Sequence, residues 1–214
     1  MATPLVIVGA GGHGREVLDV VEACIADGAP YAFIGFVDDG EPDLALLAER
    51  DAGLVGTVDD LPGLGNVAVL LGLGVAVVRR EVARHLGPVP VEPPALVHPL
   101  ASVGSRCTLG PGTIVAAGAR LTTNVTTGAH CYVGPNATVG HDCVLRSFAT
   151  IYPGAAVSGN VRVGQAATVG AGASVRQALT LGEACVVGLG AAVVRNVPDE
   201  ATVVGSPAKR LHRH

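Results

Sequence analysis

The chain has 214 residues, of which 49% are hydrophobic and only 3% aromatic, and its formal net charge at pH 7 is −4. The hydrophobic content is ample for a core and excludes a disordered chain, while the acidic balance argues against nucleic acid or an anionic membrane as a partner. The start of the chain lacks the basic region of a signal peptide, and its apolar runs are too short or too interrupted by glycine to span a bilayer. We therefore expect a cytoplasmic protein without membrane insertion.

The N-terminal part of the chain alternates between strand and helix patterns. Residues 5–8, 32–37 and 67–71 are short apolar runs typical of buried strands, and residues 15–26 place their apolar side chains on one face of a helix. Residues 75–78 begin either another strand or a helix. The alternation predicts a partial Rossmann-like α/β domain with a parallel sheet.

A glycine-rich loop follows the first strand. Gly9, Gly11 and Gly14 have the G-x-G-x-x-G spacing, and the backbone amides at such a helix start favour a phosphate. Asp38, at the end of the second strand, lies where dinucleotide folds bind a ribose hydroxyl. A full dinucleotide site needs two mononucleotide halves, and this domain has room for little more than one. The loop therefore predicts a diphosphate-linked nucleotide rather than NAD, and the alternative is a tight turn without a ligand.

From Val97 to Val193 an aliphatic residue returns at every sixth position without an insertion, with the β-branched Thr127 as the single exception. The residue four places after each aliphatic residue is small or apolar, and the residue directly after the aliphatic residue is often glycine. A period of six fits neither the period of about 3.6 of a helix nor that of about 2 of a strand. Short strands joined by identical corners explain it, so the repeat predicts a parallel β-helix. The low aromatic content agrees, because a thin prism has no room for large rings.

The cysteines follow the same repeat. Four of the five fall on its inward positions, namely Cys107, Cys131, Cys143 and Cys185. We interpret them as small core residues with reduced thiols rather than as metal ligands, and expect no metal cofactor.

Five segments spread over the whole chain together resemble one protein family. They are VIVGAGGHGREVLDVV at the start, FVDD after the second strand, HP at 98–99, VGHDC at 139–143 and VVGSPAKRL near the end. The family is that of the bacterial left-handed β-helix sugar acetyltransferases, which includes nucleotide-linked 4-amino-sugar N-acetyltransferases and sialic acid O-acetyltransferase-like proteins.

The resemblance implies a homotrimer whose subunits are left-handed solenoids of roughly five to six triangular coils. It also implies acetyl-CoA as the donor, lying along the solenoid at a subunit interface, and a nucleotide-linked amino sugar as the acceptor, with GDP-perosamine favoured. The expected divisions are a nucleotide-sugar-binding domain at 1–92, an acetyl-CoA-binding and catalytic β-helix at 93–198 and a C-terminal tail at 199–214.

The register of the coils places a cluster of polar groups at one corner. With three hexads in a coil, residues roughly 18 apart stack at about 4.8 Å. His141 then lies on a corner and faces outward. The two columns through this corner are Thr123, His141, Gly159 and Asn124, Asp142, Asn160. An imidazole, an adjoining carboxylate and a glycine amide are thus expected within one or two coils.

This cluster suits acyl transfer to an amine. A sugar ammonium must lose a proton to attack a thioester, and histidine, with an unperturbed pKa of about 6.5, is a suited base. The resemblance assigns that role to His141. We expect Asp142 to fix the tautomer of the imidazole, and the N–H of Gly159 to stabilise the oxyanion of the tetrahedral intermediate.

Further contacts are expected for the two substrates. For the nucleotide-sugar they are Gly11, Gly12, His13 and Asp38, and for the acceptor sugar Asn136, which the resemblance matches to a family asparagine. For acetyl-CoA they are Gly170, Gly172, Gly188, Lys209 and Arg210, of which the two cations are the best placed for a phosphate. Many family members carry a second histidine where this chain has Thr150, so any contact made there in relatives is in doubt here.

Other functions stay open. One alternative is O-acetylation of a sugar hydroxyl, as on a sialic acid, because the same histidine serves both reactions. Another is a non-catalytic trimeric nucleotide-binding scaffold. A metal enzyme of the carbonic anhydrase type is disfavoured, since no second histidine occupies the columns around His141.

Overall fold

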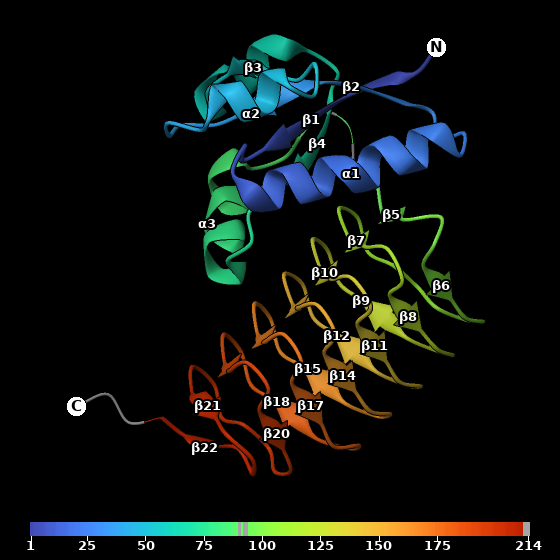
Figure 1. Ribbon diagram of the computed structural model, residues 1–214, viewed down its shortest axis with the longest axis vertical. Coiled ribbons are helices and arrows are strands. Elements are labelled where there is room, and N and C mark those ends of the chain that lie inside the picture. The colour runs from blue at the N-terminus through green and yellow to red at the C-terminus, as the bar shows by residue number, and fades with distance from the viewer. Residues whose placement is uncertain (90, 92–93, 212–214) are drawn as a thin grey trace.

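The computed structural model describes residues 1–89, 91 and 94–211, which form an α/β domain at one end of a triangular solenoid (Figure 1). The elements of the domain are β1 (Thr3–Val8), α1 (Gly12–Ala26), β2 (Tyr31–Val37), α2 (Leu44–Ala48), β3 (Leu54–Gly56), the 3-10 helix η1 (Val58–Leu64), β4 (Ala68–Leu71) and α3 (Ala76–Leu86). The four strands form a parallel sheet in the order β3-β2-β1-β4. The predicted parallel α/β domain is confirmed. Residues 75–78 lead into α3 rather than forming a strand.

Helix α1 joins the sheet to the solenoid. Its apolar face, which includes Val17 and Val21, is buried. The same hydrophobic cluster continues into Leu96, Ile114 and Tyr132 of the first coils. The helix is therefore covered on two sides, and the glycine loop at its start lies above the solenoid (Figure 1).

The solenoid consists of short strands that pair only with strands one coil away. The strands are β5 (Leu96–Val97), β6 (Ser102–Val103), β7 (Ile114–Val115), β8 (Arg120–Leu121), β9 (Thr126–Thr127), β10 (Tyr132–Val133), β11 (Thr138–Val139), β12 (Val144–Leu145), β13 (Thr150–Ile151), β14 (Ala156–Val157), β15 (Arg162–Val163), β16 (Thr168–Val169), β17 (Ser174–Val175), β18 (Thr180–Leu181), β19 (Val186–Val187) and β20 (Ala192–Val193). The pairing is parallel and connects residues 18 positions apart, as in Val133 with Ile151 and Ile151 with Val169. Three sheets line the three sides, and the expected left-handed β-helix is confirmed.

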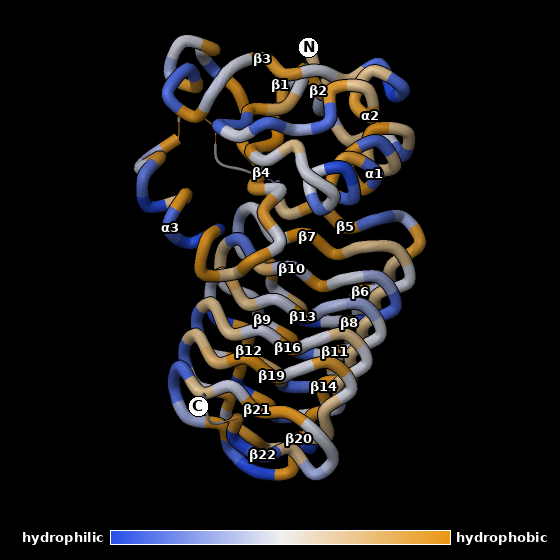
Figure 2. Tube along the Cα trace, turned by 60° about the vertical axis from the view of Figure 1, so that its left-hand side comes forward, coloured by the Kyte–Doolittle hydropathy of each residue, from blue (hydrophilic) through white to orange (hydrophobic). Residues whose placement is uncertain are grey.

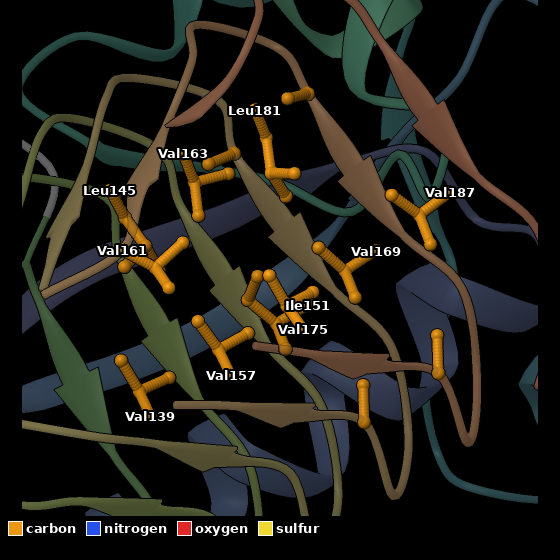
Figure 3. Close-up of a cluster of buried hydrophobic side chains, with 14 of the residues drawn as sticks. Val139, Leu145, Ile151, Val157, Val161, Val163, Val169, Val175, Leu181 and Val187 are labelled. Carbon is orange, nitrogen blue, oxygen red and sulfur yellow. The ribbon is translucent and has the colours of Figure 1, made fainter. Parts of the chain in front are cut away.

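The aliphatic residues of the six-residue repeat fill the interior of the solenoid. Its aliphatic side chains point inward from all three sides, as Val139, Leu145 and Ile151 do in Figure 3. Thr127 is buried as well. Its hydroxyl forms a hydrogen bond with the Thr113 hydroxyl at 3.1 Å and accepts another from the Gly110 amide. Replacement of an aliphatic residue by threonine therefore leaves no unpaired hydroxyl in the core.

The inward cysteines behave as core residues. Cys131, Cys143 and Cys185 are buried and Cys107 is partly so, and none of them forms a disulfide. Burial raises the pKa of the Cys131 and Cys185 thiols to about 12, which keeps them protonated and unreactive.

The corners of the solenoid use a repeated backbone conformation. The second corner residue adopts a left-handed φ in coil after coil, for example 59° at Asn124, 60° at Asp142 and 58° at Asn160. Asparagine, aspartate and glycine tolerate this conformation best, which explains why they recur at these positions.

Arg79 of α3 fastens the α/β domain to the solenoid. Its side chain is buried and donates to the carbonyls of Leu73, His130 and Phe148 at 2.6, 3.1 and 3.0 Å, and to the Thr150 hydroxyl at 2.7 Å. Among the described residues no carboxylate lies within ion-pair distance. The guanidinium therefore acts as a multiple hydrogen-bond donor rather than as half of a salt bridge.

A β-hairpin ends the described part of the solenoid. β21 (Thr202–Val204) continues the parallel stack on β19, and β22 (Lys209–Arg210) returns antiparallel to it. The same segment covers β20, since the Ala192 amide donates to Gly205 and the Ala192 carbonyl accepts from Ala208. Figure 2 shows the coils stacked beneath the domain and this hairpin at their far end. Among the described residues, no helix combines the length and apolar character needed to cross a membrane.

Candidate active site

His141 and Asp142 occupy one corner after β11, and both are partly exposed. The imidazole Nδ1 lies 2.7 Å from Asp142 Oδ2, and the side-chain amide of Asn124, one coil earlier, donates to Asp142 Oδ1 at 2.6 Å. Those bonds to Asn124 and then to His141 lower the pKa of the Asp142 carboxyl. An ionised carboxylate only accepts hydrogen bonds, so it selects the tautomer with its proton on Nδ1 and leaves Nε2 free to take a proton.

Gly159 lies directly against this imidazole, one coil later. A Cβ at Gly159 would overlap Nε2 and Cε1 of His141, so any larger residue here would displace the imidazole. No described residue accepts a hydrogen bond from its backbone N–H. The structure therefore brings His141, Asp142 and Gly159 together as the register predicts, and their catalytic roles stay predictions.

An open hollow lies beside this corner on the next coil. It has a volume of about 410 Å³ and is lined by Ser158, Arg176, Gln177 and Ala178. Arg176 lies in the column of Gly140 and Gln177 in the column of His141, two coils later in each case. Counting 36 residues along the register, rather than 18, therefore finds them. Arg176 brings a cation to this hollow.

Asn136 lies at the preceding corner, separated from His141 by β11. Its side chain rests against Gly118 of the coil before, where a Cβ would overlap the Asn136 amide oxygen. Within one chain the structure does not bring Asn136 together with His141.

Thr150 faces the α/β domain and is fully buried. Its hydroxyl accepts from Arg79 at 2.7 Å. The residue that replaces the family's second histidine therefore belongs to the joint between domain and solenoid, and is closed to a substrate.

The glycine loop divides into packed and open positions. Gly9 has a φ of 99° against Gly72, and a Cβ at Gly14 would collide with the Gly9 carbonyl. Nothing lies within 4 Å of a Cβ at Gly11, so this position is open to a ligand. Only part of the motif therefore leaves room for a diphosphate, and that part is Gly11 and Gly12 at the start of α1.

Asp38 supports the loop. Its carboxylate accepts from the Ala10 amide at 2.6 Å and from the Gly40 amide at 2.8 Å. Both oxygens thus accept a backbone hydrogen bond and brace the glycine loop, and the expected contact of Asp38 with the nucleotide-sugar stays a prediction. Asp39 similarly accepts from the Val58 amide at the start of η1.

His13 points from the loop toward the solenoid. Its ring makes an edge contact with Tyr132 at 4.5 Å, and its Nδ1 lies 3.5 Å from Glu16. Burial, and then the charge of Arg79, lowers the pKa of His13 to about 4. At neutral pH the imidazole therefore brings no positive charge to a diphosphate.

We expect His13 and His130 to make the fold acid-sensitive. Burial, followed by Arg79, lowers the pKa of His130 to about 4 as well, and its buried Nδ1 has no partner among the described residues. An unfolded histidine titrates near about 6.5, so between these values the unfolded chain binds more protons. The contribution of these histidines to the free energy of unfolding should be greatest above about pH 6.5. It should fall toward pH 4 by up to roughly 1.4 kcal/mol per pH unit for each histidine.

Denaturant unfolding at several pH values measures this slope. His130→Phe removes one of the two histidines and should therefore reduce the slope by about half. Phenylalanine should be tolerated here, because the His130 ring already stacks on Phe148, and Phe148 adopts the same left-handed backbone at its own corner. A midpoint that does not move between pH 7 and pH 5 would contradict the expectation.

The residues expected to bind acetyl-CoA lie on another corner and on the hairpin. The amides of Gly170, Gly172 and Gly188 donate to Val187, Pro153 and Val203. Those amides are therefore engaged between coils, and the expected contacts of these glycines with acetyl-CoA stay predictions. Gly172 is nevertheless open to close approach. Lys209 and Arg210 are exposed on β22.

Two further hollows lie away from His141, between α3 and η1. One has a volume of about 500 Å³ and is lined by Asp39, Val58 and Val77, and the other has about 300 Å³. The sequence does not predict these hollows, because η1 carries no periodic pattern. In the described part of the chain no group of three or more histidine, cysteine or acidic side chains is arranged to hold a metal ion.

Comparison with known proteins identifies the class of this molecule. Residues 4–86 match the PglD N-terminal domain family. The acetyltransferase domain of PglB from Neisseria gonorrhoeae is 33% identical over 97% of this chain and 99% of its own, with a TM-score of 0.86. PerB from Caulobacter crescentus, solved with CoA and GDP-perosamine, is 30% identical over 99% of both chains, with a TM-score of 0.87. WeeI from Acinetobacter baumannii is 26% identical over 98% and 100%, with a TM-score of 0.82.

No curated protein matches the chain. The similarity to PglB and PerB extends over both the α/β domain and the solenoid. The chain belongs to the hexapeptide-repeat family of sugar acetyltransferases.

Proposed function

We propose that the protein transfers the acetyl group of acetyl-CoA to the 4-amino group of a nucleotide-linked deoxy amino sugar, with GDP-perosamine as the first candidate. The observation that carries the proposal is the corner at which Asp142 holds the imidazole of His141 over the free amide of Gly159. Relatives that match the whole chain support the two substrates, since PglB was solved with acetyl-CoA and PerB with CoA and GDP-perosamine.

In the proposed mechanism His141 Nε2 accepts a proton from the sugar amine as the amine attacks the thioester carbonyl. Asp142 stabilises the imidazolium that forms, and the Gly159 N–H stabilises the oxyanion. His141 then returns the proton to the departing thiolate as the C–S bond breaks, so the products are an amide and a free thiol. The H141N variant of perosamine N-acetyltransferase from Caulobacter crescentus, which is 29% identical over 100% of this chain, was solved with CoA and GDP-perosamine.

The nucleotide-sugar is assigned to the α/β domain, with its diphosphate at Gly11 and Gly12. The hollow beside Asp39 offers the nucleoside an apolar surface. We place the domain limits at 1–92, 93–198 and 199–214, although Glu92 and Pro93 at the first limit lie outside the described residues.

The direct test is acetyl transfer to GDP- and UDP-linked 4-amino sugars, followed by release of the CoA thiol. We expect turnover with an amino sugar and faster turnover with the GDP-linked one. Turnover only with a sugar hydroxyl would favour the O-acetyltransferase alternative, and failure of all acceptors despite nucleotide binding would favour the scaffold.

A homotrimer fits the positions of the two corners. Within one chain the side formed by β11, β14 and β17 separates the His141 corner from the Gly172 corner. A donor that contacts both corners is accommodated most simply between neighbouring subunits. Sedimentation should give a trimer, and a monomer at micromolar concentration would contradict this.

We expect Lys209→Ala combined with Arg210→Ala to raise the KM for acetyl-CoA several-fold and to leave the KM for the acceptor unchanged. Both side chains are exposed, and β22 is held by backbone pairing, so the hairpin should persist. Loss of a phosphate contact in an exposed site corresponds to about 1 kcal/mol. Arg84→Ala combined with Arg146→Ala removes the same two charges from exposed positions outside the hairpin and is the matched charge control. An unchanged KM for acetyl-CoA would place the CoA phosphates elsewhere.

A further inference from the structure

Asn124 is the one described side chain besides His141 that hydrogen-bonds to the Asp142 carboxylate. Its Nδ2 lies 2.6 Å from Asp142 Oδ1, while Asp142 Oδ2 is 2.7 Å from His141 Nδ1. The two carboxylate oxygens thus have one partner each, and Asn124 occupies the oxygen that the imidazole does not.

The backbone fixes Asn124 in this place. It and Asp142 occupy the same corner position in successive coils, with φ values of 59° and 60°. The Asn124 amide donates to Ser105 at 2.9 Å, and the Asp142 amide donates to Thr123 at 3.1 Å. The two side chains therefore leave the solenoid in parallel directions, one above the other.

The exposure of the corner makes this second bond important. The side chain of Asp142 is 41% exposed, so water competes for its oxygens. A carboxylate held by one hydrogen bond alone rotates about χ2 and offers either oxygen to solvent. With Oδ1 held by Asn124, Oδ2 stays directed at Nδ1 and the tautomer of His141 stays fixed.

We propose that Asn124 is a positioning residue of the active site, which directs the Asp142 carboxylate so that His141 presents an unprotonated Nε2 to the substrate amine. The inference rests on the proposed function, because it assigns Asn124 to the same reaction. It adds a third member, from a neighbouring coil, to the pair of residues in the corner.

Asn160 provides a matched control. It is the same residue type in the same column, one coil after Asp142, with a φ of 58°, and it is exposed. Among the described residues its side chain has no hydrogen-bond partner, whereas that of Asn124 has Asp142. Replacing either by alanine imposes the same side-chain loss on the same backbone, and Ala178 shows that alanine is accepted in this column.

The kinetic test compares Asn124→Ala with Asn160→Ala. We expect Asn124→Ala to lower kcat roughly 3- to 10-fold with the KM values for both substrates unchanged, and Asn160→Ala to leave kcat unchanged. In an Asp142→Ala background the further change Asn124→Ala should have no effect on kcat, because Asn124 acts through that carboxylate. Equal losses in the two single variants, or a full additional loss in the double variant, would overturn the proposal.

A second measurement needs no turnover. The ¹⁵N chemical shifts of the His141 ring report its tautomer. We expect the Nδ1-protonated form in the wild type and in Asn160→Ala, and a mixture of tautomers in Asn124→Ala. If no acceptor is acetylated, the proposed function fails while this measurement still tests Asn124. An unchanged tautomer in Asn124→Ala would overturn the positioning role whatever the acceptor.

Discussion

His141→Asn should lower turnover by roughly 10²- to 10⁴-fold, the usual contribution of a positioned general base. Asparagine is polar and smaller than histidine, and the side chain at this corner is exposed, so the fold and both substrate sites should persist. The amide has no lone pair basic enough to take a proton from the sugar ammonium. The loss should therefore appear in kcat and not in either KM.

The pH profile separates chemistry from folding in this experiment. In the wild type kcat/KM should fall on the acid side, because a protonated imidazole accepts no proton, and that limb should be absent in His141→Asn. Asp142→Asn should reduce turnover less, since Asp142 orients the base and does not move the proton. Near-normal turnover of His141→Asn at neutral pH would mean that the amine arrives deprotonated and that His141 only positions it.

Arg79→Met should destabilise the protein by roughly 3 kcal/mol or more, which for a chain of this length lowers the Tm by about 6 °C or more. Methionine keeps the length of the side chain but removes every donor of the guanidinium. The carbonyls of Leu73, His130 and Phe148 then stay buried without their partner. Because these groups belong to both the domain and the solenoid, the variant should also unfold in two steps.

Arg84→Met is the control on the same helix. Arg84 is 80% exposed and, among the described residues, pairs only with Glu81, so its removal should change the stability by less than about 0.5 kcal/mol. Calorimetry measures both variants. Equal melting temperatures for Arg79→Met and the wild type would show that the buried guanidinium contributes nothing net to the joint.

The solenoid was predictable because its sequence repeats the same physical requirement every six residues. Each aliphatic position fills the same place in the prism, and the columns through His141 follow from counting coils. The same count could not reveal Arg79, since Arg79, Arg80 and Arg84 look alike in the sequence of α3. Only the contact with the solenoid shows that the first of them is buried while the last is exposed.

The α/β domain was predictable in its class and less so in its details. α2, β3 and η1 are short and carry no periodic pattern, so tertiary contacts define them. Asp38 shows the limit for the candidate site. A carboxylate at the end of a strand looks the same in sequence whether or not it accepts hydrogen bonds from the glycine loop, and only the structure shows that Asp38 does.

The antiparallel hairpin of β21 and β22 limits the growth of the solenoid. A parallel coil ends in an open strand edge, and an open edge is a template on which a second molecule can add its own coils. β22 runs in the direction opposite to every other strand of the stack, so no further coil continues from it in register. Gly205 and Ala208 occupy the edge of β20 in the same way. The hairpin therefore blocks association through this end of the solenoid. Because the α/β domain occupies the other end, deleting the hairpin should join molecules in pairs through their exposed edges.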